Sequence, residues 1–324
     1  MKKATAIHLA YAIAATHFVC TAVAMAQHHQ FYAAAGPRVI IPERPLPLIP
    51  GPGGSWSPSS QPYENLLVST PQEQASSVLF DYTDGPNGPD HWGELNADWS
   101  LCKSGAQQSP LAITPTLMIT DSTLGDLKAN YTSKPVNATI SHDGLNLKVD
   151  VPSSAGELKI YNVTYRPASF HFHRPSEHRI LNYSFPLELH LVHKSEDDRM
   201  AVIAWLFVPG STNNSFLAQF LDELPSHKKP YANLEISPIN LPTLEPNYGR
   251  YRGSLTTPPC SETVIWTVML WNFPSVSDYQ LKQLKSAMPR KNARPSFPSR
   301  GRKFRINHTP NWTLMKQAFK DNTY

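Results

Sequence analysis

The sequence has few cysteines, little net charge and no long apolar run after its first 26 residues. Only 3 of its 324 residues are cysteine, which is too few for a small domain built on a framework of disulfides. The formal charge of +4 is small for this length, so we expect no nucleic-acid partner. No later segment approaches the ~20 apolar residues of a membrane-spanning helix, so we expect no transmembrane segment. A hydrophobic fraction of 40% excludes a wholly disordered chain.

Residues 1–26 are typical of a secretory signal peptide. Lys2 and Lys3 form a basic start, a mostly apolar run follows, and Ala24-Met25-Ala26 fits the small-x-small pattern of a cleavage site. A buried N-terminal helix is the alternative, but the run has neither a cap nor a polar face. We therefore expect the protein to enter the secretory pathway, and to be secreted or delivered to an organelle lumen reached by that route.

Two further features agree with export. Removing the signal leaves two cysteines, Cys102 and Cys260, and an even count in an oxidising compartment predicts one disulfide, with two buried free thiols as the alternative. Seven Asn-x-Ser/Thr sequences are candidate N-glycosylation sites, which favours a eukaryotic secretory route. They are Asn130, Asn137, Asn162, Asn182, Asn213, Asn307 and Asn311.

The prolines divide the remaining chain. Eight of the 31 prolines lie between Pro37 and Pro62, where they cannot donate to a strand ladder. We interpret residues 27–77 as a flexible, partly polyproline linker, with a docking arm for a wall or matrix partner as the alternative. From 78 to 310 short apolar runs alternate with period two, which predicts a mainly β domain with helices near 215–224 and 277–288. Residues 311–324 form a C-terminal tail.

Two of these expected strands carry histidines. His171 and His173 are two residues apart, so their imidazoles lie on one face and form half of a zinc site. On the next strand Glu188 and His190 share one face and His193 lies on the other. We select His190 as third ligand, because Glu188 could hold its distal N–H. Three histidines with an open fourth position are typical of catalytic zinc, although buried histidines bonded to neighbours are a common alternative.

From about Asp81 to Phe304 the chain resembles the alpha-type carbonic anhydrases, most closely the secreted plant members. Four blocks carry the resemblance: 87–93, 108–110, 170–178 together with 188–193, and 251–262. The resemblance implies a large, twisted, mostly antiparallel sheet of about ten strands with a few short helices. It also implies a zinc enzyme that interconverts carbon dioxide and bicarbonate.

The resemblance assigns roles residue by residue. His171, His173 and His190 would bind Zn²⁺, and Glu188 and Asn292 would support these ligands. Thr256 would accept a hydrogen bond from the attacking hydroxide and donate its own proton to Glu177, because a carboxylate can only accept. The apolar wall for carbon dioxide would comprise Val192, Val202, Leu255, Val264 and Trp266. Cys102 and Cys260 would form the disulfide of extracellular members.

The chain departs from the family at three positions. The rim histidine that carries protons to solvent is replaced by Leu145 or Gly144, which predicts slow, buffer-dependent turnover. Ser169 stands where Gln commonly supports the first ligand. We further expect Glu94 to replace a tyrosine of the solvent network.

Two other functions remain open at this point. One is a storage or extracellular-matrix protein with little activity, and the other is an esterase side activity of the same site. The seven basic residues between Arg290 and Arg305 are interpreted as a solvated rim, with weak contact to an acidic extracellular polymer as the alternative. The sequence does not predict an oligomeric state.

Overall fold

A computed structural model describes residues 79–309, except 226–230, 239–240, 243, 245–246 and 289. The predicted signal peptide, linker and C-terminal tail lie outside the described residues and remain predictions. No helix among the described residues has the length and apolar character needed to cross a membrane.

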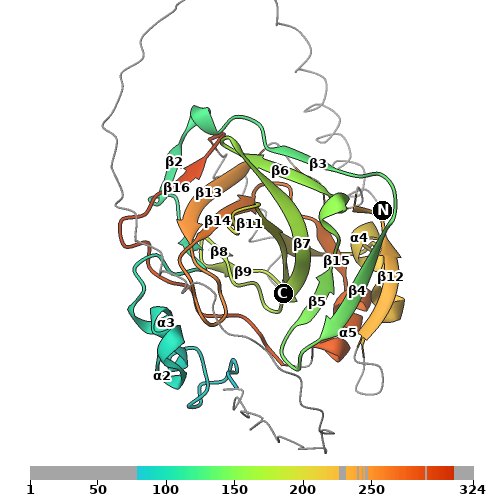
Figure 1. Cartoon of the computed structure of the whole chain (residues 1–324), viewed down its shortest axis with the longest axis horizontal. Helices are drawn as coiled ribbons and strands as arrows, with labels where there is room; N and C mark the ends of the chain where they lie inside the picture. The colour runs from blue at the N-terminus through green and yellow to red at the C-terminus, as the bar shows by residue number, and fades with distance from the viewer. Residues whose placement is uncertain are drawn as a thin grey trace, which may run out of the picture. The chain divides into compact units, whose positions relative to one another are not determined.

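Strands dominate the described chain (Figure 1). They are β1 (Ala112–Ile113), β2 (Met118–Thr120), β3 (Lys128–Tyr131), β4 (Val136–His142), β5 (Leu147–Asp150), β6 (Gly156–Ile160), β7 (Val163–His173), β8 (Arg179–Ile180), β9 (Tyr183–Ser184), β10 (Leu187–Lys194), β11 (Met200–Gly210), β12 (Tyr231–Ile236), β13 (Tyr248–Gly253), β14 (Val264–Met269), β15 (Ser275–Ser277) and β16 (Phe304–Ile306). The α-helices are α2 (Trp92–Leu95), α3 (Leu101–Ser104), α4 (Ser215–Ala218) and α5 (Asp278–Ala287), and the 3₁₀ turns are η1 (Ala97–Trp99), η2 (Ser122–Leu124), η3 (Ser153–Ala155) and η4 (Leu221–Glu223).

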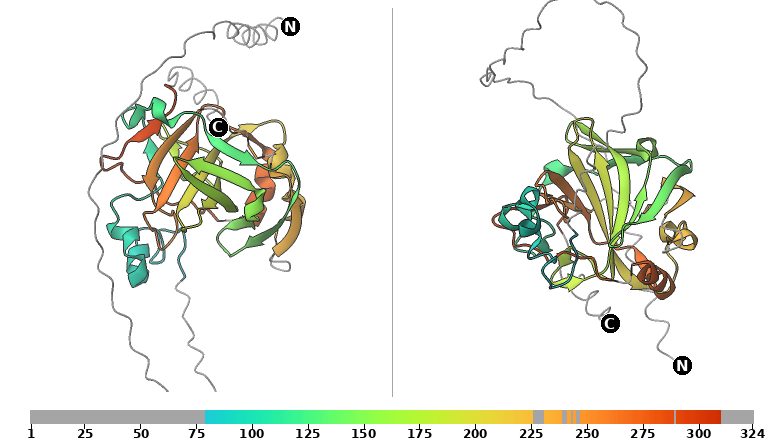
Figure 2. Two further views of the ribbon diagram at one scale, coloured as in Figure 1. Left: turned by 45° about the horizontal axis from the view of Figure 1, so that its top comes forward. Right: turned by 60° about the horizontal axis from the view of Figure 1, so that its bottom comes forward.

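One sheet of 13 strands organises the domain. Its main path is β12-β4-β5-β7-β10-β11-β14-β13-β16-β2, and β3, β6 and β15 pair off this path. Most neighbours are antiparallel, but β11 runs parallel to β14 and β15, and β16 runs parallel to β2. The sheet twists strongly (Figure 2), as adjacent strands do in large sheets. The predicted mainly β fold with a large sheet and few short helices is confirmed.

The two expected helices form with different lengths. The 215–224 segment forms only α4 followed by η4, whereas α5 occupies most of 277–288. Ser277 caps α5, because its hydroxyl accepts from the Gln280 N–H and the Gln280 side-chain oxygen accepts from the Ser277 N–H. In Figure 1 both helices lie on the same side of the sheet as β12.

The two faces of the central strands bury different cores. Phe170 and Phe172 of β7 lie on one face, where Phe170 contacts Phe216 and Phe172 contacts Phe220 at ring-centroid distances of 5.2 and 5.6 Å. The alternate residues of β7 lie on the opposite face, so His171 and His173 share a face, as the period-two pattern predicts. The α4–η4 segment therefore packs on the face that the two histidines do not use.

Candidate metal centre

Strand register brings three histidines together. His190 of β10 pairs with His171 of β7, and Glu188 pairs with His173. Each of the three imidazoles has one nitrogen within 4.8 Å of the corresponding nitrogens of the other two. His173 and His190 are buried, whereas His171 is half-buried.

Hydrogen bonds decide which nitrogen of each ring is available. His173 Nδ1 donates to the Asn292 backbone carbonyl at 2.7 Å, and His190 Nε2 donates to Glu188 at 2.7 Å. The nitrogens that remain available to a metal ion are His173 Nε2 and His190 Nδ1. His190 Nδ1 lies 3.3 Å from His171 Nε2. His173 Nε2 is buried and has no hydrogen-bond partner among the described residues. A buried imidazole nitrogen with a free lone pair is what a metal ion satisfies, so the donor set fits Zn²⁺.

The imidazoles of His171 and His190 are held in the neutral form that metal binding requires. Burial, followed by the neighbouring His173 and His190, lowers the pKa of His171 well below 6.5. Burial also lowers the pKa of His190 to about 4, although Glu188 acts in the opposite direction.

Glu188 is the central acceptor beneath the site. Its carboxylate is fully buried and accepts from His178 Nδ1 at 2.6 Å, from His190 Nε2 at 2.7 Å, and from the backbone N–H groups of Glu177 and His178 at 2.7 and 2.8 Å. Burial alone would raise the pKa of Glu188, but His178 and His190 hold it well below 4.5. His178, Glu188 and His190 also lie close enough to resemble a metal site. Since their facing atoms are already hydrogen-bonded to one another, we interpret them as a network that orients His190.

Asn292 supports the opposite ligand. Beyond its carbonyl bond to His173, its side chain accepts from the Arg174 N–H at 2.8 Å and donates to the Phe172 carbonyl at 2.8 Å and to Asn146 Oδ1 at 3.1 Å. The contact with the ligand is thus made by the backbone of Asn292, and its buried side chain holds that backbone in place.

Glu177 lies directly beside the ligands. Its Oε2 is 3.4 Å from His173 Nε2 and 3.9 Å from His190 Nδ1, and its Oε1 accepts from the Arg294 N–H at 2.9 Å. Burial raises the pKa of Glu177, and His173, the Arg294 N–H and the Thr256 hydroxyl oppose that rise. Thr256 is buried, and its role as a hydrogen-bond donor to Glu177 stays a prediction.

The five expected wall residues gather on the histidine face. Val192 pairs with Val202, which pairs with Trp266. Leu255 and Val264 pack in the same apolar cluster as these three residues. The Trp266 ring lies 4.7 Å from the His190 ring. The structure thus supplies an apolar surface next to the candidate ligands, and Val192 and Leu255 are its half-buried members.

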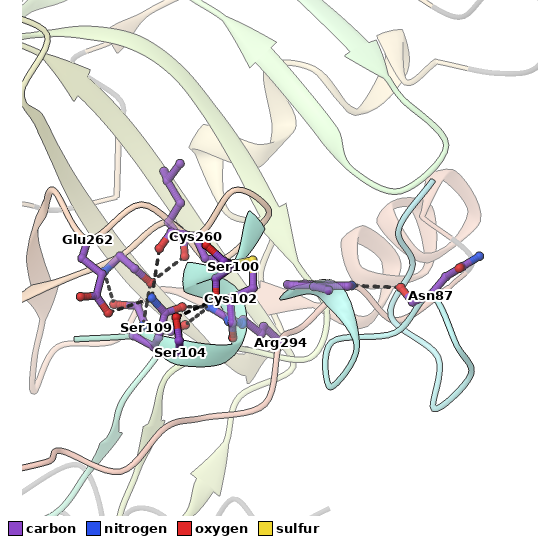
Figure 3. Close-up of a disulfide and its surroundings, with 12 residues drawn as sticks. Asn87, Ser100, Cys102, Ser104, Ser109, Cys260, Glu262 and Arg294 are labelled. Atoms are coloured by element: carbon purple, nitrogen blue, oxygen red, sulfur yellow. Dashed lines mark hydrogen bonds between the residues drawn. A yellow bond between two sulfur atoms is a disulfide. The ribbon is translucent and has the colours of Figure 1, made fainter. Parts of the chain in front are cut away.

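The predicted disulfide joins Cys102 to Cys260, with an S–S distance of 2.05 Å. Figure 3 shows Arg294 beside it, where the guanidinium donates to the Cys102 carbonyl at 3.0 Å and to Gln108 Oε1 at 2.8 Å. Gln108 Nε2 in turn donates to the Cys260 carbonyl at 3.0 Å. The loop that carries Thr256 is therefore tied to α3 directly by the disulfide and indirectly through Gln108 and the buried Arg294. Arg294 is only 2% exposed, so for this residue the interpretation as a solvated rim is wrong.

The structure also shows where the three positions lie at which the chain departs from the family pattern. Leu145 lies in the turn between β4 and β5, and the nearby His142 uses Nδ1 to accept from the Gly144 N–H at 2.9 Å. Ser169 is buried on β7, opposite Val192 of β10 and Asp150 of β5.

The expectation for Glu94 is wrong. It is half exposed on α2 and pairs with Lys103 and His91, so it has no part in the network around the ligands.

Tyr82 was missed by sequence reasoning. Burial, followed by the charges of Glu177 and Asp143, raises the pKa of its phenol well above 10.0, and its ring lies 5.4 Å from that of Trp92. An aromatic residue just ahead of a recognised block is the only signal that could have indicated it.

The glycosylation candidates differ in exposure. Asn130, Asn137, Asn162, Asn182 and Asn213 are exposed, whereas Asn311 lies outside the described residues. Asn307 is buried, and its carboxamide accepts from the Tyr248 N–H at 3.0 Å and donates to the Gly125 carbonyl at 3.3 Å. The structure contradicts Asn307 as an acceptor, because its amide nitrogen is already enclosed and bonded.

Comparisons with known proteins agree with this geometry. The family model of eukaryotic-type carbonic anhydrases matches residues 87–308. Dioscorin dioA3 of Dioscorea japonica is 38% identical over 232 residues, which cover 68% of this chain and 83% of that protein. Alpha carbonic anhydrase 3 of Arabidopsis thaliana is 34% identical over 254 residues, covering 74% and 89%.

Solved structures show the same likeness. A crystal structure of dioscorin complexed with ascorbate is 37% identical, with a TM-score of 0.67 over 72% of this chain and 99% of that chain. The alpha-carbonic anhydrase from Thermovibrio ammonificans in complex with the inhibitor sulfanilamide is 31% identical, with a TM-score of 0.65 over 70% and 99%.

Proposed function

Since the chain belongs to the eukaryotic-type carbonic anhydrase family, we propose that it catalyses the zinc-dependent, reversible hydration of carbon dioxide to bicarbonate and a proton. The observation that supports this most directly is the set of three converging imidazoles, with the buried and unpartnered Nε2 of His173 among them. When bound, Zn²⁺ would lower the pKa of a water molecule to about 7 and so supply hydroxide at neutral pH.

The residues around the ligands have distinct tasks in this proposal. His171, His173 and His190 hold the metal, and the bonds from Asn292 and Glu188 fix the tautomers of the last two. Neither support is a solvent-exposed group, so the ring orientations are set before any ligand arrives.

Thr256 and Glu177 control the orientation of the nucleophile. A Glu177 carboxylate can only accept a hydrogen bond, so the Thr256 hydroxyl donates to it and offers its own lone pair to the attacking hydroxide. The apolar wall around Val202 and Trp266 admits carbon dioxide, which has no net charge and needs no charged partner. The substrate is thus placed by shape and by exclusion of water from one side of the metal.

A protein on the same fold with little activity, serving in storage or in the extracellular matrix, is the second candidate. Two observations favour it: Leu145 leaves the rim without an imidazole for proton transfer, and Ser169 is shorter than the amide expected beside the first ligand. Hydrolysis of activated esters would be a side activity of the same site. For either function we propose entry into the secretory pathway, on the basis of residues 1–26 and the five exposed glycosylation candidates.

Elemental analysis and carbon dioxide hydration together test the proposal. We expect about one zinc per chain and hydration that a sulfonamide-type zinc ligand abolishes. The variant His173→Gln should lose zinc and activity, whereas His193→Gln, which changes a buried imidazole on the other face of β10, should retain zinc. A protein that binds no zinc and hydrates no carbon dioxide would rule out the enzyme. Full zinc content with negligible hydration would favour the storage or matrix role.

A further inference from the structure

A cationic groove lies on the face of the sheet opposite the histidines. Arg250 and Arg252 of β13 pair with Thr267 and Ile265 of β14, which alternate with the residues of the apolar wall. The groove has a volume of about 360 Å³, which is within the range of small ligand sites. Five of its nine lining residues are cationic and none is acidic.

Arg250 is a buried cation without a counter-ion. It is only 7% exposed, its Nε donates to Thr267 Oγ1 at 3.2 Å, and its guanidinium lies 4.9 Å from the centroid of the Tyr248 ring. Within the described part of the chain, no carboxylate lies within 4.0 Å of it. A buried guanidinium normally has an anionic partner, because a neutral hydroxyl and a ring only partly replace the water that it has lost.

The register of the neighbouring strand adds a second cation at the same place. Arg305 of β16 pairs directly with Arg250 across the β13–β16 ladder. Like charges in directly opposite positions destabilise a sheet. Asp121 forms an ion pair with Arg305 at 2.8 Å, and that carboxylate also accepts from Thr123. The charge of Arg305 is thus compensated within the protein, whereas that of Arg250 is not.

The rim of the groove adds further positive charge. Arg252 and Lys303 are exposed, and neither forms an ion pair with a described residue. Arg302 is held in place, because its guanidinium donates to the Gln108 carbonyl at 2.7 Å. Glu262 acts on Arg302 through its charge, but its carboxylate already accepts from Gln108 Nε2 at 2.9 Å.

An exposed aromatic ring completes the lining. Tyr161 lies in the turn between β6 and β7 and is 68% exposed. It adopts a positive φ of 54°, which is uncommon for a residue with a large side chain. Arginine guanidinium groups bind carboxylates through two parallel hydrogen bonds, and a tyrosine ring offers a flat apolar surface. Together they match a ligand that carries both a carboxylate and a ring with an apolar face.

We propose that this groove binds an acidic polysaccharide made of uronic-acid units. One carboxylate would reach the buried guanidinium of Arg250, the next would meet Arg252 or Lys303 at the rim, and a sugar ring would lie on Tyr161. The formal charge of the whole chain is only +4, yet the lining of this groove holds five cations and no acidic group. Arg250 and Arg252 alternate along β13 with Tyr251, which lies over Trp266 on the histidine face, so substitutions of the groove cations leave the candidate metal ligands untouched.

Calorimetric titration of the full chain with tetragalacturonate, at low and at physiological salt, tests the proposal. The double variant Arg252→Gln/Lys303→Gln should bind at least tenfold more weakly. The matched control Lys282→Gln/Lys285→Gln removes the same charge from two exposed lysines of α5 and should bind within twofold of the wild type. Tyr161→Ala keeps every charge and should still weaken binding severalfold. Carbon dioxide hydration should be unchanged in all three variants, so failure of this proposal is distinct from failure of the proposed function.

Three results would overturn the assignment. The first is equal binding by the groove variant and the α5 variant, which would mean that only net charge matters. The second is equally tight binding of a neutral tetrasaccharide. The third is binding of RNA or of anionic phospholipid vesicles without measurable binding of tetragalacturonate, which would place a different polyanion in the groove.

Discussion

Replacing Glu188 by glutamine tests whether the buried carboxylate holds both the fold and the third ligand. In the wild type four donors converge on its two oxygens at 2.6 to 2.8 Å. Glutamine keeps one oxygen and presents an amide N–H₂ in place of the other, so at least two buried donors lose their acceptor. Each such loss costs about 1–3 kcal/mol, and more when the group involved is charged, so the loss of two acceptors costs roughly 3–5 kcal/mol.

We therefore expect Glu188→Gln to lower the free energy of unfolding of the metal-free protein by about 3–5 kcal/mol. For a domain of this size each kcal/mol corresponds to about 2–4 °C in melting temperature, so the midpoint should fall by roughly 6–20 °C. His190 also loses the acceptor that fixes its tautomer, which should weaken zinc binding by about 10- to 100-fold.

Urea unfolding of the metal-free protein and chelator competition for zinc measure the two effects separately. Glu157→Gln is the control, because Glu157 pairs with Lys159 at 2.9 Å at the surface and should change neither quantity. The pH dependence gives a further check. The pKa of Glu188 is depressed in the folded state, so its contribution is complete above about pH 4.5 and is lost as the pH falls through the folded pKa. The stability difference between wild type and variant should shrink accordingly.

The reasoning would be refuted by a Glu188→Gln protein whose free energy of unfolding is within about 1 kcal/mol of the wild-type value and which binds zinc equally well. Such a protein would show that the four buried hydrogen bonds to Glu188 contribute little to stability or to zinc binding. A loss of stability with unchanged zinc affinity would refute only the orienting role of Glu188. That result would imply that packing against Trp266 alone sets the position of the His190 ring.

Three further predictions concern stability and turnover. Burial lowers the pKa of His193 to about 4, so the unfolded chain binds a proton at higher pH than the folded chain does. The free energy of unfolding measured in urea should therefore fall by roughly 3 kcal/mol between pH 6.5 and pH 4, and His193→Gln should not show this decrease. The double variant Cys102→Ser/Cys260→Ser should lower the free energy of unfolding by up to about 5 kcal/mol, because the bond closes a loop of 158 residues; unchanged urea midpoints would show that the buried Arg294 alone braces the loop. Leu145→His should raise turnover in dilute buffer and reduce its dependence on added imidazole in stopped-flow hydration assays, and an unchanged buffer dependence would show that proton transfer at the rim is not limiting.

The local patterns allowed much of the site to be predicted. Period-two alternation correctly put His171 and His173 on one face, and the pairing of β7 with β10 brought His190 to that face. The choice of His190 over His193 depended on the carboxylate two residues before it, and the structure shows that carboxylate hydrogen-bonded to the ring. These inferences succeeded because strand alternation is a property of a few consecutive residues.

Other features depend on contacts between distant segments. Sequence could not show that the backbone carbonyl of Asn292 would meet His173, 119 positions earlier, or that the carboxamide of Asn307 would be buried. Glu94 was misplaced because a helix of four residues gives no information about which way it faces in the folded domain.

The sequence by itself determined the strand faces, the candidate ligands, the family and the two cysteines available to pair. Only the tertiary structure decided which nitrogen of each imidazole is free, where Tyr82 lies, and that Arg250 faces Arg305 across a ladder. The physical reason is that a side chain's face follows from its own strand, whereas its neighbours follow from the register between strands. Burial and charge compensation belong to that second level, and they distinguish an arginine that is solvated from one that lacks a counter-ion.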